Sequence, residues 1–91
     1  MAKFVMLGKY SADALNGISA ERTKKGIELI EKSGGKVISM LALLGRYDIL
    51  LVADFPGINE AMKTSIALTK LTGIGFNTCA AISVEELDKL A

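Results

Sequence analysis

The chain has 91 residues, enough for one domain, with 51% hydrophobic and 23% charged residues. This composition excludes an intrinsically disordered chain, because disordered chains are poorer in apolar residues and more lopsided in charge. The 11 basic and 10 acidic residues nearly cancel to a net charge of +1, which argues against a nucleic-acid-binding protein. We therefore expect a single domain over residues 1–91.

The first predicted element is a strand over residues 3–10, in which successive apolar side chains occupy both faces of the pleat. A loop over residues 11–18 follows. A helix is then predicted over residues 19–32, since Ser19 is a good N-cap and apolar residues recur at helical spacing behind it. Gly34 ends this helix, because glycine readily adopts the left-handed conformation found just after a helix.

The second half of the chain predicts three further strands and two further helices. Pro56 breaks the chain after the third strand, since proline cannot donate a hydrogen bond to a sheet. A short helix capped by Ser83 follows the fourth strand. In chain order, these elements are strands over residues 36–44 and 47–54, a helix over 58–72, a strand over 73–82 and a helix over 83–90.

The order of elements is βαββαβ with a short C-terminal helix. Right-handed crossovers around a central hairpin produce a ferredoxin-like sandwich, in which both long helices cover one face of an antiparallel sheet. The sequence therefore predicts an α+β protein of this class.

The turn at Gly45-Arg46 predicts the register of the central hairpin, because a two-residue loop with glycine first is typical of a type II′ turn. One face of this hairpin has no charged residue and is predicted to lie beneath the helices: Ile38, Met40, Ala42, Leu44, Tyr47, Ile49, Leu51 and Ala53. The opposite face carries five large aliphatic side chains among polar ones: Val37, Leu41, Leu43, Leu50 and Val52.

This second apolar face indicates that the protein needs a partner. Burial contributes about 1.5–3 kcal/mol for each aliphatic side chain, so five of them amount to a total on the order of 10 kcal/mol. That total is comparable with the stability of a whole domain. The short last helix is too small to cover a four-stranded sheet. We therefore expect a homo-oligomer, a dimer at least, paired through this face.

At Gly45-Arg46-Tyr47-Asp48 the sequence resembles the GYD domain family, which is named after a Gly-x-Tyr-Asp signature at this hairpin. Other positions agree with the resemblance in order and spacing: Arg22, Gly34-Gly35-Lys36-Val37, Pro56, Thr78 and Ala81. The resemblance covers essentially the whole chain. It implies a ferredoxin-like fold of the dimeric α/β-barrel type, with Gly45, Tyr47 and Asp48 as structural signature residues. It implies little about activity.

Four polar residues are candidates for ligand binding: Tyr10, Ser39, Asp48 and Asn77. In this interpretation Asp48 points into a cavity between paired subunits and accepts a hydrogen bond from a ligand amine or hydroxyl. The alternative is structural, with Asp48 capping the turn or pairing with a nearby cation while Tyr47 packs under a helix. The sequence leaves both interpretations open.

The sequence contains no histidine and only one cysteine, Cys79. This excludes the usual zinc sites and the Ser/His and Cys/His nucleophiles, so we expect no metal and no cofactor. The best hypothesis is a homo-oligomeric module that binds a small, largely apolar molecule between subunits. A cofactor-independent enzyme similar to small monooxygenases and a purely structural assembly protein are the alternatives, so the sequence does not decide whether the chain is an enzyme.

The apolar segments are too short to place the chain in a membrane. A membrane span needs about 20 apolar residues, whereas the longest apolar run covers residues 37–44 and the first, residues 4–7, is too short for a signal peptide. We therefore expect no membrane association and a cytoplasmic location.

Overall fold

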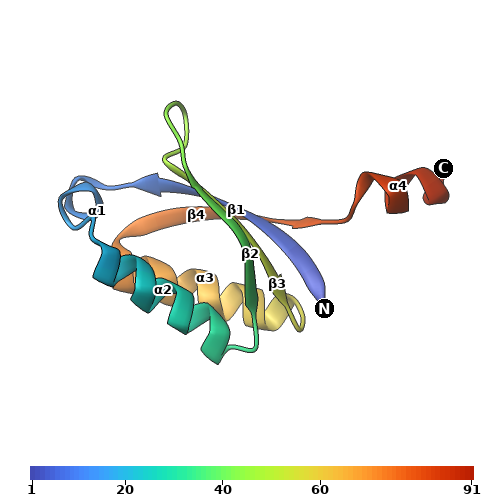
Figure 1. Ribbon diagram of the computed structural model, residues 1–91, viewed down its shortest axis with the longest axis horizontal. Helices are drawn as coiled ribbons and strands as arrows, with labels where there is room; N and C mark the ends of the chain where they lie inside the picture. Colours follow the sequence, from blue (N-terminus) through green and yellow to red (C-terminus); the bar gives the residue numbers. More distant parts are fainter.

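The computed structural model describes residues 1–91 and shows a four-stranded antiparallel sheet with two long helices against one face (Figure 1). The predicted α+β class and the βαββαβ order are confirmed, in agreement with a ferredoxin-like fold. In chain order the elements are β1 (Ala2–Tyr10), α1 (Ala12–Asn16), α2 (Ala20–Lys32), β2 (Lys36–Ala42), β3 (Ile49–Phe55), α3 (Ile58–Thr72), β4 (Ile74–Ala81) and α4 (Val84–Leu90).

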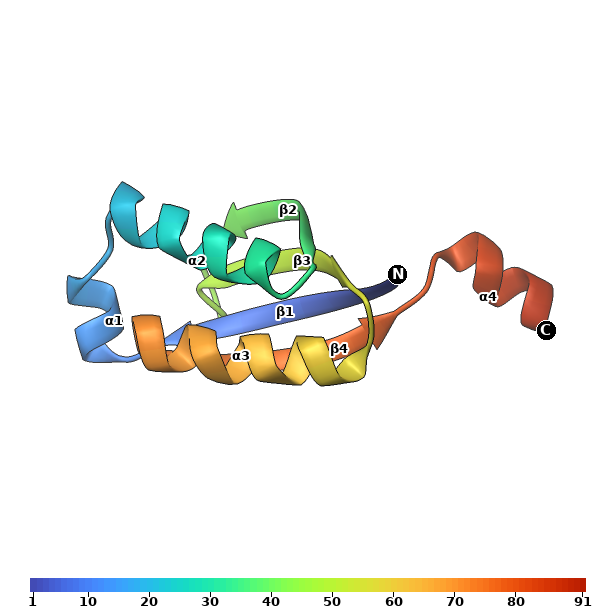
Figure 2. The same cartoon turned by 90° about the horizontal axis from the view of Figure 1, so that it is seen from below.

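The strands lie in the order β2-β3-β1-β4, so β3 and β1 are central while β2 and β4 form the edges. In β1 the even-numbered residues from Phe4 to Gly8 are buried, whereas Val5 and Leu7 remain partly exposed. Because side chains alternate across a strand, the even-numbered side of β1 faces the helices. Figure 2 shows α2 and α3 running side by side across this face.

The core forms between this face and the two long helices. Phe4 and Phe55 meet edge to face, with ring centroids 5.8 Å apart and an interplanar angle of 65°. This is a favourable geometry for two aromatic rings. The buried cluster contains residues from the two central strands, β1 and β3, and from both long helices: Phe4, Met6, Ile30, Leu51, Ala53, Phe55, Ala61 and Leu68.

The predicted helix boundaries follow from capping. Ser19 lies just before α2, and its side chain accepts a hydrogen bond from the Arg22 backbone amide. Gly34 follows α2 with φ +86°, a conformation that favours glycine. The expectation that residues 11–18 form a simple loop is wrong, because they include α1. Ser11 caps this short helix by accepting from the Ala14 amide, and the burial of Ala14 holds it against the body.

Gly8 occupies a central strand because neighbouring side chains leave no room for a larger residue. A β-carbon at this position would lie 2.5 Å from Ile49 Cγ2 and 2.8 Å from Ile74 Cγ2. These methyl groups are attached directly to their own β-carbons and cannot rotate away independently. The glycine therefore lets β1 pass between β3 and β4 at the end of the sheet nearest the hairpin loop.

The hairpin between β2 and β3 differs from the prediction in two ways. The register is correct from Ser39↔Val52 to Ala42↔Ile49, but a β-bulge at Ile38 shifts the pairing so that Val37 lies opposite Ala53. Val37 therefore packs against the core, whereas Ile38 is 46% exposed, the reverse of what we expected. A bulge inserts one extra residue into a strand and exchanges the two faces beyond it.

The predicted two-residue type II′ turn is also wrong. The Leu43 amide donates to the Asp48 carbonyl at 2.8 Å, so the last bonded pair encloses a longer loop. Leu44 is fully exposed in this loop instead of lying beneath a helix. Gly45 has φ +152°, so a glycine is still favoured there.

The C-terminal helix α4 stands apart from the rest of the molecule (Figures 1 and 2). It continues outward from the end of β4, near the N-terminus, and contains no buried residue. It therefore covers neither face of the sheet, which leaves the face opposite α2 and α3 uncovered.

Candidate functional site

The uncovered face of the sheet carries a continuous group of aliphatic side chains, which we call the open face: Val5, Leu7, Leu41, Leu50 and Val52. Register places them side by side, because Val5 lies opposite Val52, while Leu7 lies opposite Leu50 and Leu50 opposite Leu41. The open face thus differs from the predicted one. Val37 has moved to the core, and Val5 and Leu7 of the central strand β1 take part.

Polar groups lie on the same side of the sheet at its two edges. Asn77 lies on β4 opposite Leu7, and its side-chain amide donates to the Tyr47 hydroxyl at 3.3 Å. The Cys79 thiol donates to Oδ1 of the Asn77 side chain at 3.7 Å. Ser39 lies on β2, at the other edge, opposite Val52. With neighbouring strands about 4.8 Å apart and an offset of two residues along the strands, Ser39 and Asn77 are separated by roughly 16 Å across one protomer.

The Asp48 carboxylate binds the backbone of β1. Its Oδ2 accepts from the Tyr10 amide at 2.8 Å, while the Asp48 amide donates to the Gly8 carbonyl at 2.8 Å. The side chain therefore satisfies a strand-end N–H that lies beyond the last regular β1–β3 pair, Gly8↔Ile49. Asp48 fastens the hairpin loop to the end of β1.

Tyr10 lies on the helix side of the sheet, away from Ser39 and Asn77. The Arg22 guanidinium carbon lies 5.6 Å from the centre of the Tyr10 ring, and Arg22 Nη1 donates to the Ala14 carbonyl at 2.6 Å. These two side chains lie beside an internal hollow of about 50 Å³ between α2 and the sheet, which also contacts Met40, Leu51, Leu68 and Phe76. Our site prediction missed Arg22, although it is the only arginine on a helix whose other cations are lysines.

The hollows show which surfaces of one protomer can hold a ligand. Pockets for metabolite-sized ligands usually measure about 300–1,000 Å³, and the internal hollow of about 50 Å³ is far smaller. A larger space of about 350 Å³ lies between α3 and β4. Ser39, Asp48 and Asn77 line none of the five main hollows. Within one protomer, only Asp48 and Tyr10 of the four candidate residues are in contact.

A family model of the GYD domain matches residues 4–91, essentially the whole chain. The chain belongs to the GYD domain family. No curated protein matches it.

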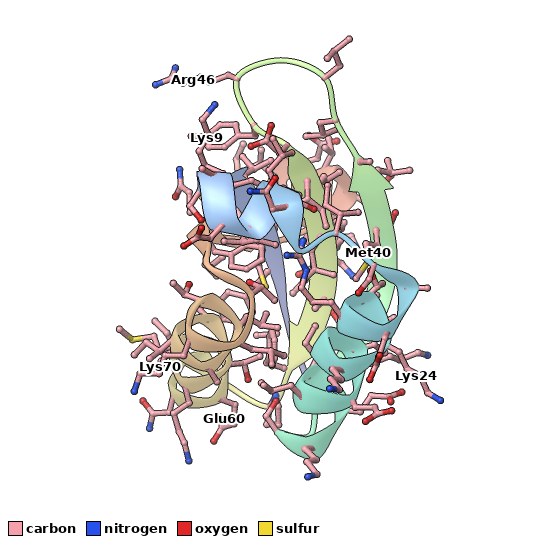
Figure 3. All side chains as sticks on the ribbon, turned by 90° about the vertical axis from the view of Figure 1, so that its left-hand side faces the viewer. Lys9, Lys24, Met40, Arg46, Glu60 and Lys70 are labelled. Atoms are coloured by element: carbon pink, nitrogen blue, oxygen red, sulfur yellow. The ribbon has the colours of Figure 1, made fainter.

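The signature of this GYD domain has a structural explanation in the hairpin loop. Gly45 adopts its positive φ, the Tyr47 hydroxyl meets Asn77 of β4, and Asp48 binds the backbone of β1. Lys9 adds a third link, since its amine donates to the Arg46 carbonyl at 3.1 Å; Figure 3 shows the two residues at the same end of the molecule. The signature thus connects the loop to β1 and to β4.

Metal binding and membrane spanning have no structural support in this GYD domain. No group of three or more His, Cys, Asp or Glu side chains is placed to hold a metal ion. None of the helices combines the length and the apolar composition that crossing a membrane requires.

Replacing Asp48 by alanine should lower the free energy of unfolding by about 1–2 kcal/mol, because the Tyr10 amide loses a charged hydrogen-bond acceptor. Asp48→Asn keeps a side-chain oxygen and should lose less than half as much. Urea titration followed by circular dichroism at one fixed protein concentration measures both changes. Equal stability of the alanine variant and the unmodified protein would contradict this role of Asp48.

Proposed function

We propose that this GYD domain is a homo-oligomeric binding module whose subunits pair through their open faces and enclose a small, largely apolar molecule between them. The observation that carries the proposal is the open face itself. Its five aliphatic side chains lie together on the two central strands and β2, while α2 and α3 cover only the opposite side. Soluble proteins seldom leave such an apolar surface uncovered.

The dimensions of the sheet suit such an interface. At about 3.3 Å per residue along a strand and about 4.8 Å between strands, four strands of seven residues span roughly 23 by 19 Å. The side chains that project from this area add to its accessible surface. The whole face therefore approaches the roughly 800 Å² that each partner buries in a stable complex. A second copy of the chain offers the same shape and the same apolar residues, so it is the simplest cover.

The polar edges of the sheet supply groups that could orient a ligand. A twofold axis parallel to the strands sets β2 of one subunit over β4 of the other. Register then places Ser39 over Cys79 of the partner subunit, two residues along β4 from Asn77, across the roughly 10 Å that separates packed sheets. A molecule between the sheets would contact aliphatic side chains along its length and meet Ser39, Asn77 and the Tyr47 hydroxyl at its ends.

Two measurements on the unmodified protein test this proposal. Light scattering at micromolar concentration should give a mass at least twice that of one chain. Native mass spectrometry should detect a co-purified small molecule on the oligomer, or a thermal-shift screen of apolar metabolites should find a compound that raises the melting temperature.

A monomeric mass at micromolar concentration would overturn the pairing. An oligomer that carries no molecule and responds to no compound would overturn the binding role and leave a structural assembly function.

A further inference from the structure

The projecting helix α4 has an apolar stripe that nothing in its own chain covers. Ser83 caps this helix by accepting from the Glu86 amide, so α4 is well formed although it stands apart from the body. Val84, Leu87 and Leu90 recur every third residue and are 67%, 55% and 77% exposed. A helix of this kind usually packs its apolar side against another surface.

A matching surface lies along the outer side of α3. Ile58, Met62 and Ile66 recur every fourth residue on this helix and are 64%, 60% and 56% exposed. Two hollows of about 350 and 370 Å³ lie between them and β4. Both hollows are lined by Ser65, Ile66 and Phe76, so they adjoin each other, and we call the two together the α3–β4 trough.

The trough is long enough to hold α4, and the apolar rows of the two helices have complementary spacing. At about 1.5 Å per residue, the seven residues of α4 measure roughly 10 Å, and α3 from Ile58 to Lys70 measures roughly 18 Å. The stripe on α4 follows an i, i+3 row, and the stripe on α3 follows an i, i+4 row. Rows of these two kinds interlock when helices cross at about +20°.

Charge supports the same pairing. Apart from Lys89, the charged residues of α4 are all acidic: Glu85, Glu86 and Asp88. On α3, Lys63 and Lys70 are exposed, and Lys70 lines the trough. Figure 3 shows Lys70 on the side of α3 that faces away from α2, whereas Glu60 lies in the first turn of the helix. An acidic helix in the trough would therefore lie beside a lysine.

From these observations we propose that α4 of one copy docks in the α3–β4 trough of a second copy. In this structure α4 stands apart from the trough of its own chain and is joined to β4 by Ile82 and Ser83 alone. The contact also differs from the pairing of open faces. The trough lies on the helix side of the sheet, where Phe4, Phe76 and Ala80 form its floor.

Disulfide trapping between two differently marked chains tests this docking. One chain carries Met62→Cys and the other Leu87→Cys, both with Cys79→Ser so that no other thiol is present. The two are mixed in equal amounts and oxidised with a copper–phenanthroline reagent. A matched control replaces Leu87→Cys by Lys89→Cys, which lies on the opposite side of the same helix. The four substituted side chains, Met62, Cys79, Leu87 and Lys89, are exposed, so the fold should be retained.

We expect the Met62–Leu87 mixture to form the mixed disulfide at least tenfold faster than the Met62–Lys89 control. Equal rates would overturn the proposal, because they indicate random collision. A single chain with both Met62→Cys and Leu87→Cys that closes its own disulfide faster than the mixture forms its bond would overturn it too, since α4 would then occupy its own trough.

Discussion

Replacing Phe55 by alanine should lower the free energy of unfolding by about 3–5 kcal/mol, as expected for deleting a buried ring and leaving a cavity. The Phe55 side chain is completely buried and lies at the end of β3, where its ring packs against Phe4. Its ring also packs so closely on Gly35 that a β-carbon there would lie 2.9 Å from it. The backbone around Phe55 fits its ring closely. It should therefore collapse only partly into the cavity that the alanine substitution leaves.

For a domain of this size the change corresponds to a melting temperature lower by about 15–30 °C. Differential scanning calorimetry at one fixed protein concentration measures it, since self-association raises apparent stability. Leu44→Ala is the matched control: Leu44 is fully exposed in the hairpin loop, and its removal should shift the melting temperature by less than about 3 °C. A Phe55→Ala shift as small as that of the control would show that Phe55 is not part of the cooperative core.

Replacing Leu7 by aspartate should abolish pairing through the open face at micromolar concentration and so lower the mass of the proposed oligomer. Leu7 lies at the middle of the open face, opposite Leu50 on one side and Asn77 on the other. In a symmetric pair, two new carboxylates would be buried without partners. Burying one unpaired charge costs at least about 3 kcal/mol, and about 4 kcal/mol corresponds to a dissociation constant raised about a thousandfold.

In the free monomer the same carboxylate stands on the exposed side of β1, in line with Lys9, so folding should be little affected. Leu44→Asp adds an identical charge at the hairpin loop and should leave the mass unchanged. Light scattering and sedimentation on both variants distinguish a loss of open-face pairing from a general effect of the added charge. If Leu7→Asp keeps the mass of the unmodified protein, the open face is not the interface.

The order of elements was readable from the sequence because each one has a local cause. Ser19 and Ser83 cap helices as predicted, Gly34 ends one, and the bounds of α3 match the predicted residues 58–72. The bulge at Ile38 has no such local signal. Val37 and Ile38 are both β-branched and apolar, so either could face the core, and only the packing of Val37 against the core decides between them.

The candidate site was harder to predict, because it depends on which face of the sheet each residue occupies. Tyr10 shares a face of β1 with Phe4, Met6 and Gly8, but apolar side chains occupy both faces of this strand, so alternation alone did not show which face meets the helices. The contact between Asp48 and the Tyr10 amide joins residues far apart in sequence at an irregular strand end. No periodic pattern reports such a contact. The trough beside α3 depends in the same way on β4, which lies next to that helix only in the folded chain.

The bulge in β2 also affects how the sheet can grow. An exposed edge strand with a regular row of amides and carbonyls can recruit the edge of another molecule, and repeated recruitment at both edges produces fibres. Here β2 is interrupted at Ile38, whereas β4 pairs with β1 without a break. Only the β4 edge is regular, and an antiparallel β4–β4 contact is closed by a twofold axis after two copies. The irregular β2 edge therefore protects this apolar-rich chain against open-ended aggregation.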